Sequence, residues 1–140
     1  MKATGIPSTH VPLVWDQLWP LLEPAFAQSP EKPDLLAGLV NRDFQLWCVF
    51  DRNKPVSGIV TRLWRDTTSG SLDCRIWLVG GERLSDWVSD FLDILIPWAK
   101  AEGATTLSAA GRKGWARLGA RLGWERDGEE AGMPRWKAVI

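Results

Sequence analysis

The sequence contains no tyrosine, one histidine and two cysteines, which limits the chemistry it can support. A structural or catalytic zinc site needs three or four clustered ligands, and His10 with two widely separated cysteines does not supply them. Cys48 and Cys74 lie in strongly apolar runs, which indicates buried, reduced thiols in a cytoplasmic protein. We therefore expect no metal centre.

An excess of charge of one sign and long apolar runs are also missing. Seventeen basic and seventeen acidic residues cancel, so no overall field attracts the protein to nucleic acid or to an anionic membrane. No run of about eighteen apolar residues could span a membrane, and the N-terminal residues lack the apolar centre of a signal peptide. We expect a cytoplasmic protein that does not bind a membrane. The balanced charge also disfavours nucleic acid as a partner.

The composition and hydrophobic periodicity predict one mixed α/β domain covering residues 1–140. The chain has the length of a single domain and enough hydrophobic residues, 45%, to bury a core. In order, we expect helices at about 9–28 and 33–41, antiparallel strands at 45–51, 56–64 and 71–79, a long helix at 85–103, a strand at 105–109, a helix at 114–122, and strands at 124–126 and 135–139. A further strand within 3–11 is an option. This order predicts a mixed central sheet with helices on both faces.

Three local features refine this expectation. Pro20 and Pro24 each remove a backbone donor and should kink or divide the first helix. Ser85 or Asp86 can cap the long helix, and Gly103 can end it. In the strand at 71–79, period-two alternation places the apolar residues Leu72, Cys74, Ile76 and Leu78 on one face.

Two short segments in the second half resemble a known superfamily. Residues 98–107, WAKAEGATTL, and residues 122–125, LGWE, resemble the long-helix-to-strand passage and the last helix ending of GNAT acyltransferases. Gly80-Gly81, Asp86-Trp87 and residues 111–117, GRKGWAR, resemble more closely the small GNAT-like proteins encoded by tailed phages and prophages. The resemblance implies a GNAT fold, acetyl-CoA as cofactor and an amine acceptor, either a small molecule or a protein. It also implies virion association and phage structural proteins as further options.

The resemblance implies a cofactor site at the start of the long helix, where backbone amides bind the pyrophosphate. The family motif Q/R-x-x-G-x-G/A is absent, because Trp87 and Ser89 hold its glycine positions. The substitute is the strand-to-helix turn containing Val79, Gly80, Gly81 and Arg83, in which Glu82 would repel phosphate. A flexible connection is the alternative explanation of this glycine pair.

The last predicted helix contributes a second basic group. Arg112 and Lys113 precede it, where they can hold cofactor phosphates or an acidic partner. Lys113, Arg117 and Arg121 follow helical spacing and form either a functional stripe or a solvated face.

The family's transfer reaction requires a base for the amine and often uses a tyrosine as acid for the leaving thiolate. Gly119 occupies the position of that tyrosine, so the acid is missing. Asp73 or Glu82 can act as the base, although an ion pair of Asp73 with Arg62 or Arg75 is the alternative. Two functions therefore stay open, namely an acetyl-CoA-dependent N-acyltransferase with a degenerate cofactor motif, or a catalytically inactive GNAT-like protein acting through protein contacts in particle assembly or host interaction. A homodimer is compatible with either.

The resemblance also implies where a structure would decide between these functions. The family's cofactor cleft lies where two core strands separate, here near Val79 and Leu107. If Trp77, Trp87 or Trp115 fills that cleft, catalysis by the family's route is disfavoured.

Overall fold

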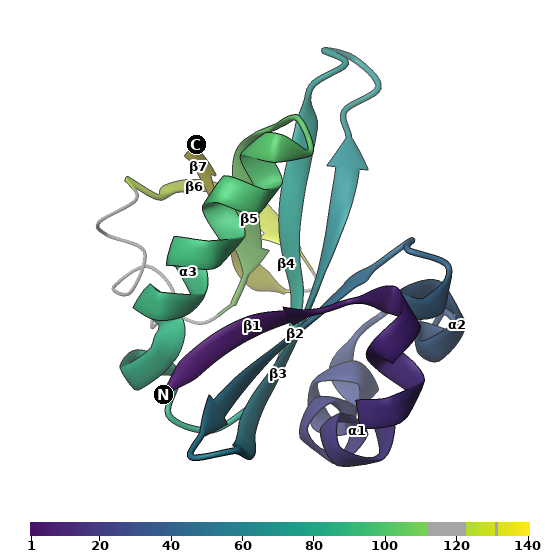
Figure 1. Ribbon diagram of the computed structural model, residues 1–140. Helices are drawn as coiled ribbons and strands as arrows, with labels where there is room; N and C mark the ends of the chain where they lie inside the picture. The colour runs from purple at the N-terminus through teal and green to yellow at the C-terminus, as the bar shows by residue number, and fades with distance from the viewer. Residues whose placement is uncertain (112–122, 131) are drawn as a thin grey trace.

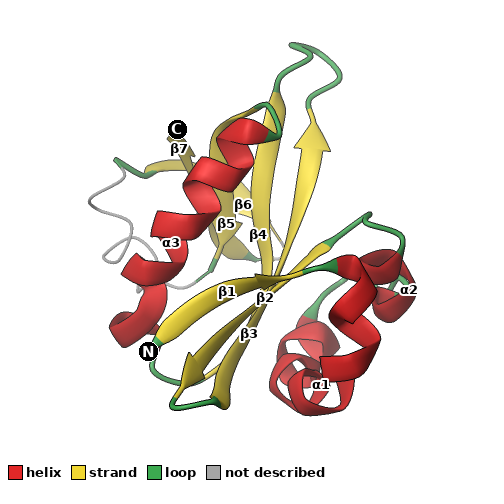
Figure 2. Cartoon of the chain, viewed as in Figure 1, coloured by secondary structure: helices red, strands yellow, loops and turns green. Residues whose placement is uncertain are grey.

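The computed structural model describes residues 1–111, 123–130 and 132–140. The helix expected at 114–122 lies outside the described residues, and so do Arg112, Lys113 and the rest of the basic stripe. In the described part, a single twisted sheet forms the centre of the molecule, with helices against its two faces (Figures 1 and 2). The mixed α/β class expected from the sequence is therefore confirmed.

Within the described residues, the sheet has seven strands in the order β1-β2-β3-β4-β5-β7-β6. Strands β4 and β5 run parallel, and every other neighbouring pair is antiparallel. The elements are β1 (Lys2–Ile6), η1 (Ser8–His10), α1 (Val11–Gln28), α2 (Leu35–Val40), β2 (Gln45–Asp51), β3 (Lys54–Arg65), β4 (Leu72–Gly81), α3 (Leu84–Ala101), β5 (Ala104–Ala110), β6 (Glu125–Glu130) and β7 (Met133–Val139). The parallel pair requires a crossover, which α3 provides.

Two hydrophobic cores lie on the two faces of the sheet. Helix α3 buries Trp87, Phe91 and Leu95 against one face. Helices α1 and α2 bury Leu18 and Leu22, among others, against the opposite face. Each helix thus places one apolar stripe on the sheet and leaves the other side to solvent.

The prolines of α1 do not divide the helix. Helix α1 runs without interruption from Val11 to Gln28 and contains both Pro20 and Pro24. The two prolines lie four residues apart and both are exposed, so the missing backbone hydrogen bonds fall on the solvent side of the helix. The expected division of the helix at these prolines was therefore wrong, because the lost hydrogen bonds lie away from the face of α1 that packs on the sheet.

Helix α3 starts earlier than expected and is capped differently. Its N-cap is Arg83, which has a left-handed φ of 63° and makes no side-chain capping hydrogen bond. Ser85 and Asp86 lie in its first turn, so the prediction that one of them caps the helix was wrong. Gly103, with φ of 97°, follows the last turn as expected for a helix end.

The alternation expected along β4 is broken at Trp77. Thr61 of β3 pairs with Ile76, whereas its neighbour Val60 pairs with Leu78, so Trp77 is an extra residue in a β-bulge. Cys74 and Ile76 consequently face the α3 core, and Leu78 faces the α1–α2 core. The prediction that residues 72, 74, 76 and 78 share one face was therefore wrong beyond the bulge.

Candidate functional site

The pairing of strands β4 and β5 ends at the bulge. Their register pairs run from Leu72 with Ala104 to Ile76 with Ala109, and no described residue of β5 pairs with β4 beyond Ile76. Strand β4 nevertheless continues to Gly81 along β3. The last part of β4 therefore presents an edge whose backbone N–H and C=O groups are not used by β5.

The glycine pair at the end of this edge is required by packing. A Cβ on Gly80 would lie 1.8 Å from the carbonyl oxygen of Leu21 in α1. A Cβ on Gly81, whose φ is 109°, would lie 2.3 Å from the carbonyl oxygen of Val56. Both residues belong to β4, and Gly80 is buried. The glycine pair is therefore part of a strand and not the flexible connection that the sequence allowed. Close approach of two backbones explains these glycines.

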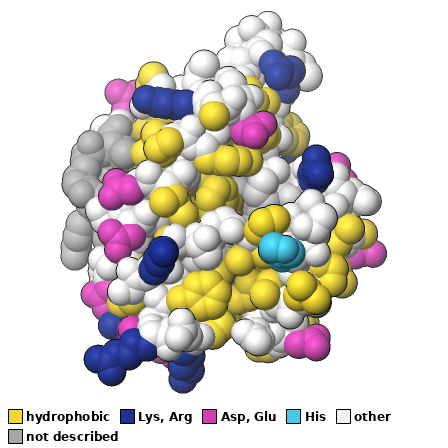
Figure 3. Space-filling model, in the orientation of Figure 1, with side chains coloured by type: hydrophobic (Ala, Val, Ile, Leu, Met, Phe, Trp, Pro, Cys, Tyr) yellow, Lys and Arg dark blue, Asp and Glu magenta, His cyan; other side chains and the backbone are white. Residues whose placement is uncertain are grey.

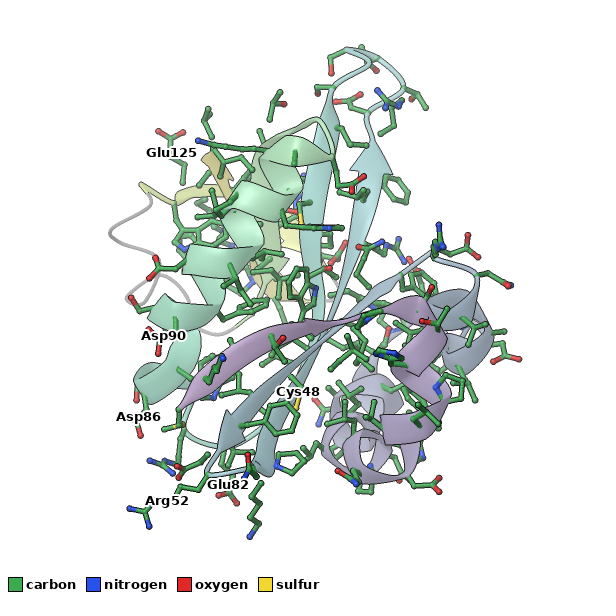
Figure 4. All side chains as sticks on the ribbon, viewed as in Figure 1. Cys48, Arg52, Glu82, Asp86, Asp90 and Glu125 are labelled. Carbon is green, nitrogen blue, oxygen red and sulfur yellow. The ribbon has the colours of Figure 1, made fainter. Side chains whose placement is uncertain are left out.

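Acidic side chains surround the turn from β4 into α3. Arg83 donates hydrogen bonds to Asp86 and to Asp51, each at 3.1 Å. These hydrogen bonds raise the pKa of Arg83, and the one to Asp86 has the larger effect. Figure 4 shows Asp86 and Asp90 along the first half of α3, and Glu82 before the helix, near Arg52. The backbone amides at the N-terminus of α3 favour an anion. The arginine at this end, Arg83, already pairs with Asp51 and Asp86.

The two described tryptophans of this region pack in opposite cores. Trp87 lies inside α3 against Phe91, and its indole N–H donates to the carbonyl of Glu82 at 2.8 Å. Trp77 packs against the α1–α2 core, with ring centres 6.4 Å from Phe26 of α1 and 5.0 Å from Phe44, and its indole N–H donates to Ser29. Trp115 lies outside the described residues.

Asp73 lies at the other end of β4. One carboxylate oxygen accepts a hydrogen bond from Thr106 at 2.6 Å, and the other accepts one from Ser108. No ion pair to Asp73 forms among the described residues, so the alternative pairing with Arg62 or Arg75 is wrong. These arginines pair instead with Glu31 and Glu130.

Burial around this cluster changes the titration of two nearby groups. Desolvation lowers the pKa of Arg75 to about 10, partly offset by the negative charge of Asp73. Desolvation also raises the pKa of the Cys74 thiol to about 12, and Cys48 is affected similarly. Both thiols therefore stay protonated near neutrality and are poor nucleophiles.

The structure separates the residues expected to form one site. Val79, Gly80, Gly81, Glu82 and Arg83 lie together at the turn into α3. Asp73 lies nine positions before Glu82 along an extended strand, which corresponds to about 30 Å. The two candidate bases are thus at opposite ends of β4, and Trp87 and Ser89, the positions of the family's glycines, lie inside α3 rather than in the turn.

The hydroxyl partners of Asp73 are residues that the sequence reasoning missed. Thr106 and Ser108 alternate with Leu107 along β5, so the strand pattern placed them on one face, but nothing local indicated that Asp73 would be their partner. Among the described residues, no group of three histidine, cysteine, aspartate or glutamate side chains could hold a metal ion. No described helix is long and apolar enough to cross a bilayer.

Comparison with known proteins places this arrangement in a fold group. No protein-family model and no curated protein sequence matches the chain. Solved structures do match. They include the ribosomal-protein-alanine N-acetyltransferase of Brucella melitensis, with TM-score 0.68, 15% identity and 100% of both chains covered. A GNAT family acetyltransferase of Elizabethkingia anophelis, with acetyl-CoA bound, matches with TM-score 0.65 and 14% identity over 99% of this chain and 97% of that one.

An IAA acetyltransferase of Bacillus cereus matches with TM-score 0.66 and 14% identity over 99% of this chain and 98% of that one. At such low identity the likeness extends to the fold and not to the substrate. The chain therefore has the GNAT acetyltransferase fold that the residues of its second half predicted.

Proposed function

We propose that this chain is a GNAT-type N-acyltransferase that uses acetyl-CoA and an amine acceptor. The observation that carries the proposal is the end of β4–β5 pairing at Ile76 and Ala109, next to the bulge at Trp77. The free β4 backbone offers donors and acceptors to the amide groups of the cofactor arm. The same edge leads into the amide end of α3, where phosphate groups are favoured.

In this proposal the chain's residues have separate tasks. Val79, Gly80, Gly81 and Arg83 contact the cofactor from the turn, and Arg112 and Lys113 contribute cations from the following segment. When bound, acetyl-CoA supplies the acetyl thioester. A base of this chain would then accept the proton that the attacking amine loses, and coenzyme A would leave as the thiolate.

Asp73 is the better placed of the two candidate bases. Glu82 lies beside the turn assigned to the phosphates, whereas Asp73 lies toward the paired end of β4, with both oxygens oriented by hydroxyl groups. No tyrosine is available to protonate the thiolate. A missing general acid is compatible with slow transfer, because such groups contribute roughly 10²- to 10⁴-fold.

A second function is favoured by the same turn, namely a catalytically inactive GNAT-like protein that acts through protein contacts. Packing explains Gly80 and Gly81 without a phosphate, and Asp51 and Asp86 occupy Arg83. Hydrophobic side chains also gather over α1 (Figure 3), and Leu13 of this helix is 77% exposed. The resemblance to phage and prophage proteins extends this proposal to particle assembly in a bacterial host, and co-purification with phage particles tests it.

Thermal unfolding with acetyl-CoA separates the two functions. Binding to the native state at a hundred times Kd should stabilise the protein by about 2.7 kcal/mol. Arg83→Ala and Arg112→Ala should each reduce that shift, whereas Arg42→Ala, a matched loss of charge at the distant end of α2, should leave it unchanged. No shift at millimolar acetyl-CoA, or an equal shift with ADP alone, would remove the acyltransferase proposal.

A further inference from the structure

Strand β1 forms an open edge of the sheet, separate from the β4 edge assigned to the cofactor. It is the first strand in the sheet order (Figure 1), and among the described residues it pairs only with β2. Successive residues of an edge strand direct their backbone N–H and C=O groups alternately to the neighbouring strand and outward. The outward groups of β1 therefore have no strand partner in the described part of the chain.

The backbone of this edge is accessible. Gly5 is exposed and has no side chain, so its exposed surface is backbone. A Cβ at Gly5 would lie 3.1 Å from the ring of Trp47, which packs in the α3 core. Ala3 and Thr4 are also small, so no large side chain keeps a further strand away from the middle of β1.

The opposite edge of the sheet has the protection that β1 lacks. Strand β6 contains four acidic side chains in the sequence ERDGEE, and its pairing with β7 is interrupted by a register shift between Arg126 and Glu129. The pairing of β1 with β2 has no such shift, and β1 contains no proline and one charged residue, Lys2. Charges and bulges are the usual means of preventing strand addition. Of these two edges, β1 is therefore the one open to it.

A hollow of about 420 Å³ adjoins the start of β1. It is lined by Met1, Lys2, Thr4, Phe50, Arg52 and Asn53. Lys2 and Phe50 are register partners and share a face, and Phe50 packs against the α1–α2 core. The hollow therefore lies on the α1–α2 face of the sheet, and its volume is in the range of ligand-binding clefts.

The charged side chains of the hollow are positive and unpaired. Lys2 and Arg52 are the two charged side chains in its lining. Within the described residues, neither forms an ion pair. Figure 3 shows Lys and Arg side chains gathered at the end of the molecule where Figure 4 labels Arg52. Of the nearby acids, Asp51 pairs with Arg83, and Glu82 does not line the hollow. The charges in the lining therefore favour a carboxylate.

The turn between β2 and β3 holds Arg52 in place. Arg52 and Asn53 have φ of 50° and 69°, as a type I′ turn requires at both central positions. Asp51 and Lys54, on either side of the turn, are register partners. Arg52 is thus fixed beside β1 by a two-residue turn instead of lying on a long loop.

We propose that the β1 edge is a docking site for an extended, acidic segment of a partner protein. The segment adds as a further strand beside β1, and backbone hydrogen bonds supply the attraction common to any sequence. Its carboxylates lie at the hollow with Lys2 and Arg52 and supply the selectivity. The docking requires neither of the two functions proposed above, because it uses none of their residues.

Fluorescence anisotropy with the full chain and a fluorescein-labelled TVTVEVE peptide, amidated at its C-terminus, tests this docking. The two glutamates lie on one face of a strand. This peptide should bind, and the peptide with glutamine at both positions should bind at least about fivefold more weakly through loss of the ion pairs. A TVPPEVE peptide should not bind. Successive residues direct their N–H groups to opposite sides, so one of the two prolines removes a donor that faces β1.

Two variants of the protein test the cations. Lys2→Gln and Arg52→Gln should each weaken binding of the glutamate peptide about two- to fivefold, with little effect on the glutamine peptide. Lys100→Gln, an equal loss of charge at the far end of α3, is the matched control and should change neither affinity. All three side chains are exposed, so the variants should fold.

Amide hydrogen exchange tests whether the peptide occupies the edge itself. One of the amide groups of Thr4 and Gly5 points outward, and its exchange should slow when the glutamate peptide is bound. No binding at millimolar peptide, equal binding of the glutamate and glutamine peptides, or binding of the proline peptide overturns the proposal. Unchanged affinity in both Lys2→Gln and Arg52→Gln, or unchanged exchange at both amides, also overturns it. A stable dimer in sedimentation that excludes the peptide would assign the edge to a second copy of this chain and would likewise overturn it.

Discussion

Replacing Gly80 with alanine tests whether packing alone requires the glycine pair at the end of β4. The new Cβ would lie 1.8 Å from the Leu21 carbonyl oxygen and 3.1 Å from the Leu22 Cα, whereas ordinary contact begins near 3.4 Å. The backbone of α1 would have to move away by about 1.6 Å, the difference between 3.4 and 1.8 Å. This helix holds Leu18 and Leu22 in the core, so the movement would open that core.

We expect Gly80→Ala to lower the free energy of unfolding by about 3 kcal/mol, the upper part of the range for overpacking. A chain of this length should then unfold at a temperature about 10 °C lower. Urea titration followed by tryptophan fluorescence measures the change. With a total stability of about 5–15 kcal/mol, the variant should still fold.

Gly58→Ala is the matched control, because Gly58 is the register partner of Gly80 on β3 and also faces α1. Its Cβ would meet only side-chain atoms of Leu22, the nearest being Cγ at 3.2 Å, and no backbone atom within 4 Å is among its three nearest neighbours. We expect a loss of about 1 kcal/mol or less. If Gly80→Ala is no more destabilising than Gly58→Ala, packing does not explain the glycine pair, and a ligand-binding role for the backbone gains support.

Three further changes test the turn and the buried thiols. Trp87→Phe should destabilise the protein by about 1–3 kcal/mol, because it leaves the Glu82 carbonyl without its indole donor; a urea midpoint equal to that of the wild type would contradict this. Glu82→Gln should tighten acetyl-CoA binding about two- to fivefold by removing a negative charge at the α3 amide end, and a loosened Kd in calorimetry would show that the phosphates bind elsewhere. Burial raises the pKa of Cys48 and Cys74 from 9.0 to about 12, so the unfolded state releases these protons first and stability should fall as pH rises above about 9. Urea titrations between pH 8 and 10 should show this fall in the wild type and a smaller one in the Cys48→Ala, Cys74→Ala double variant.

Much of the fold was predictable because it depends on local pattern. The apolar stripe of α3 has helical spacing, and Gly103 follows its last turn as a helix end requires. The runs that became β2 and β5 are apolar and bounded by turn residues. These signals act within a few residues, so they were readable without knowing what each element packs against.

The site was less predictable because its contacts join distant parts of the chain. Thr106 and Ser108 meet Asp73 only when β5 lies parallel to β4, across a sequence separation of more than thirty residues. The bulge at Trp77, which ends the alternation of β4, appears as a register change against β3. The alternation of apolar and polar residues predicts a β-strand, but it does not locate an extra residue within that strand.

By itself, the sequence determined the α/β class, the order of the main elements and the residues whose resemblance indicated a GNAT fold. The absence of tyrosine and the balance of charge are also properties of composition alone. Only the tertiary structure decided that Gly80 and Gly81 are needed for close packing and that Arg83 is held by two carboxylates. It also decided that Thr106 and Ser108 donate hydrogen bonds to Asp73. The physical reason is that each of these properties depends on a distance between separate elements, and such distances exist only after the sheet and its helices have packed together.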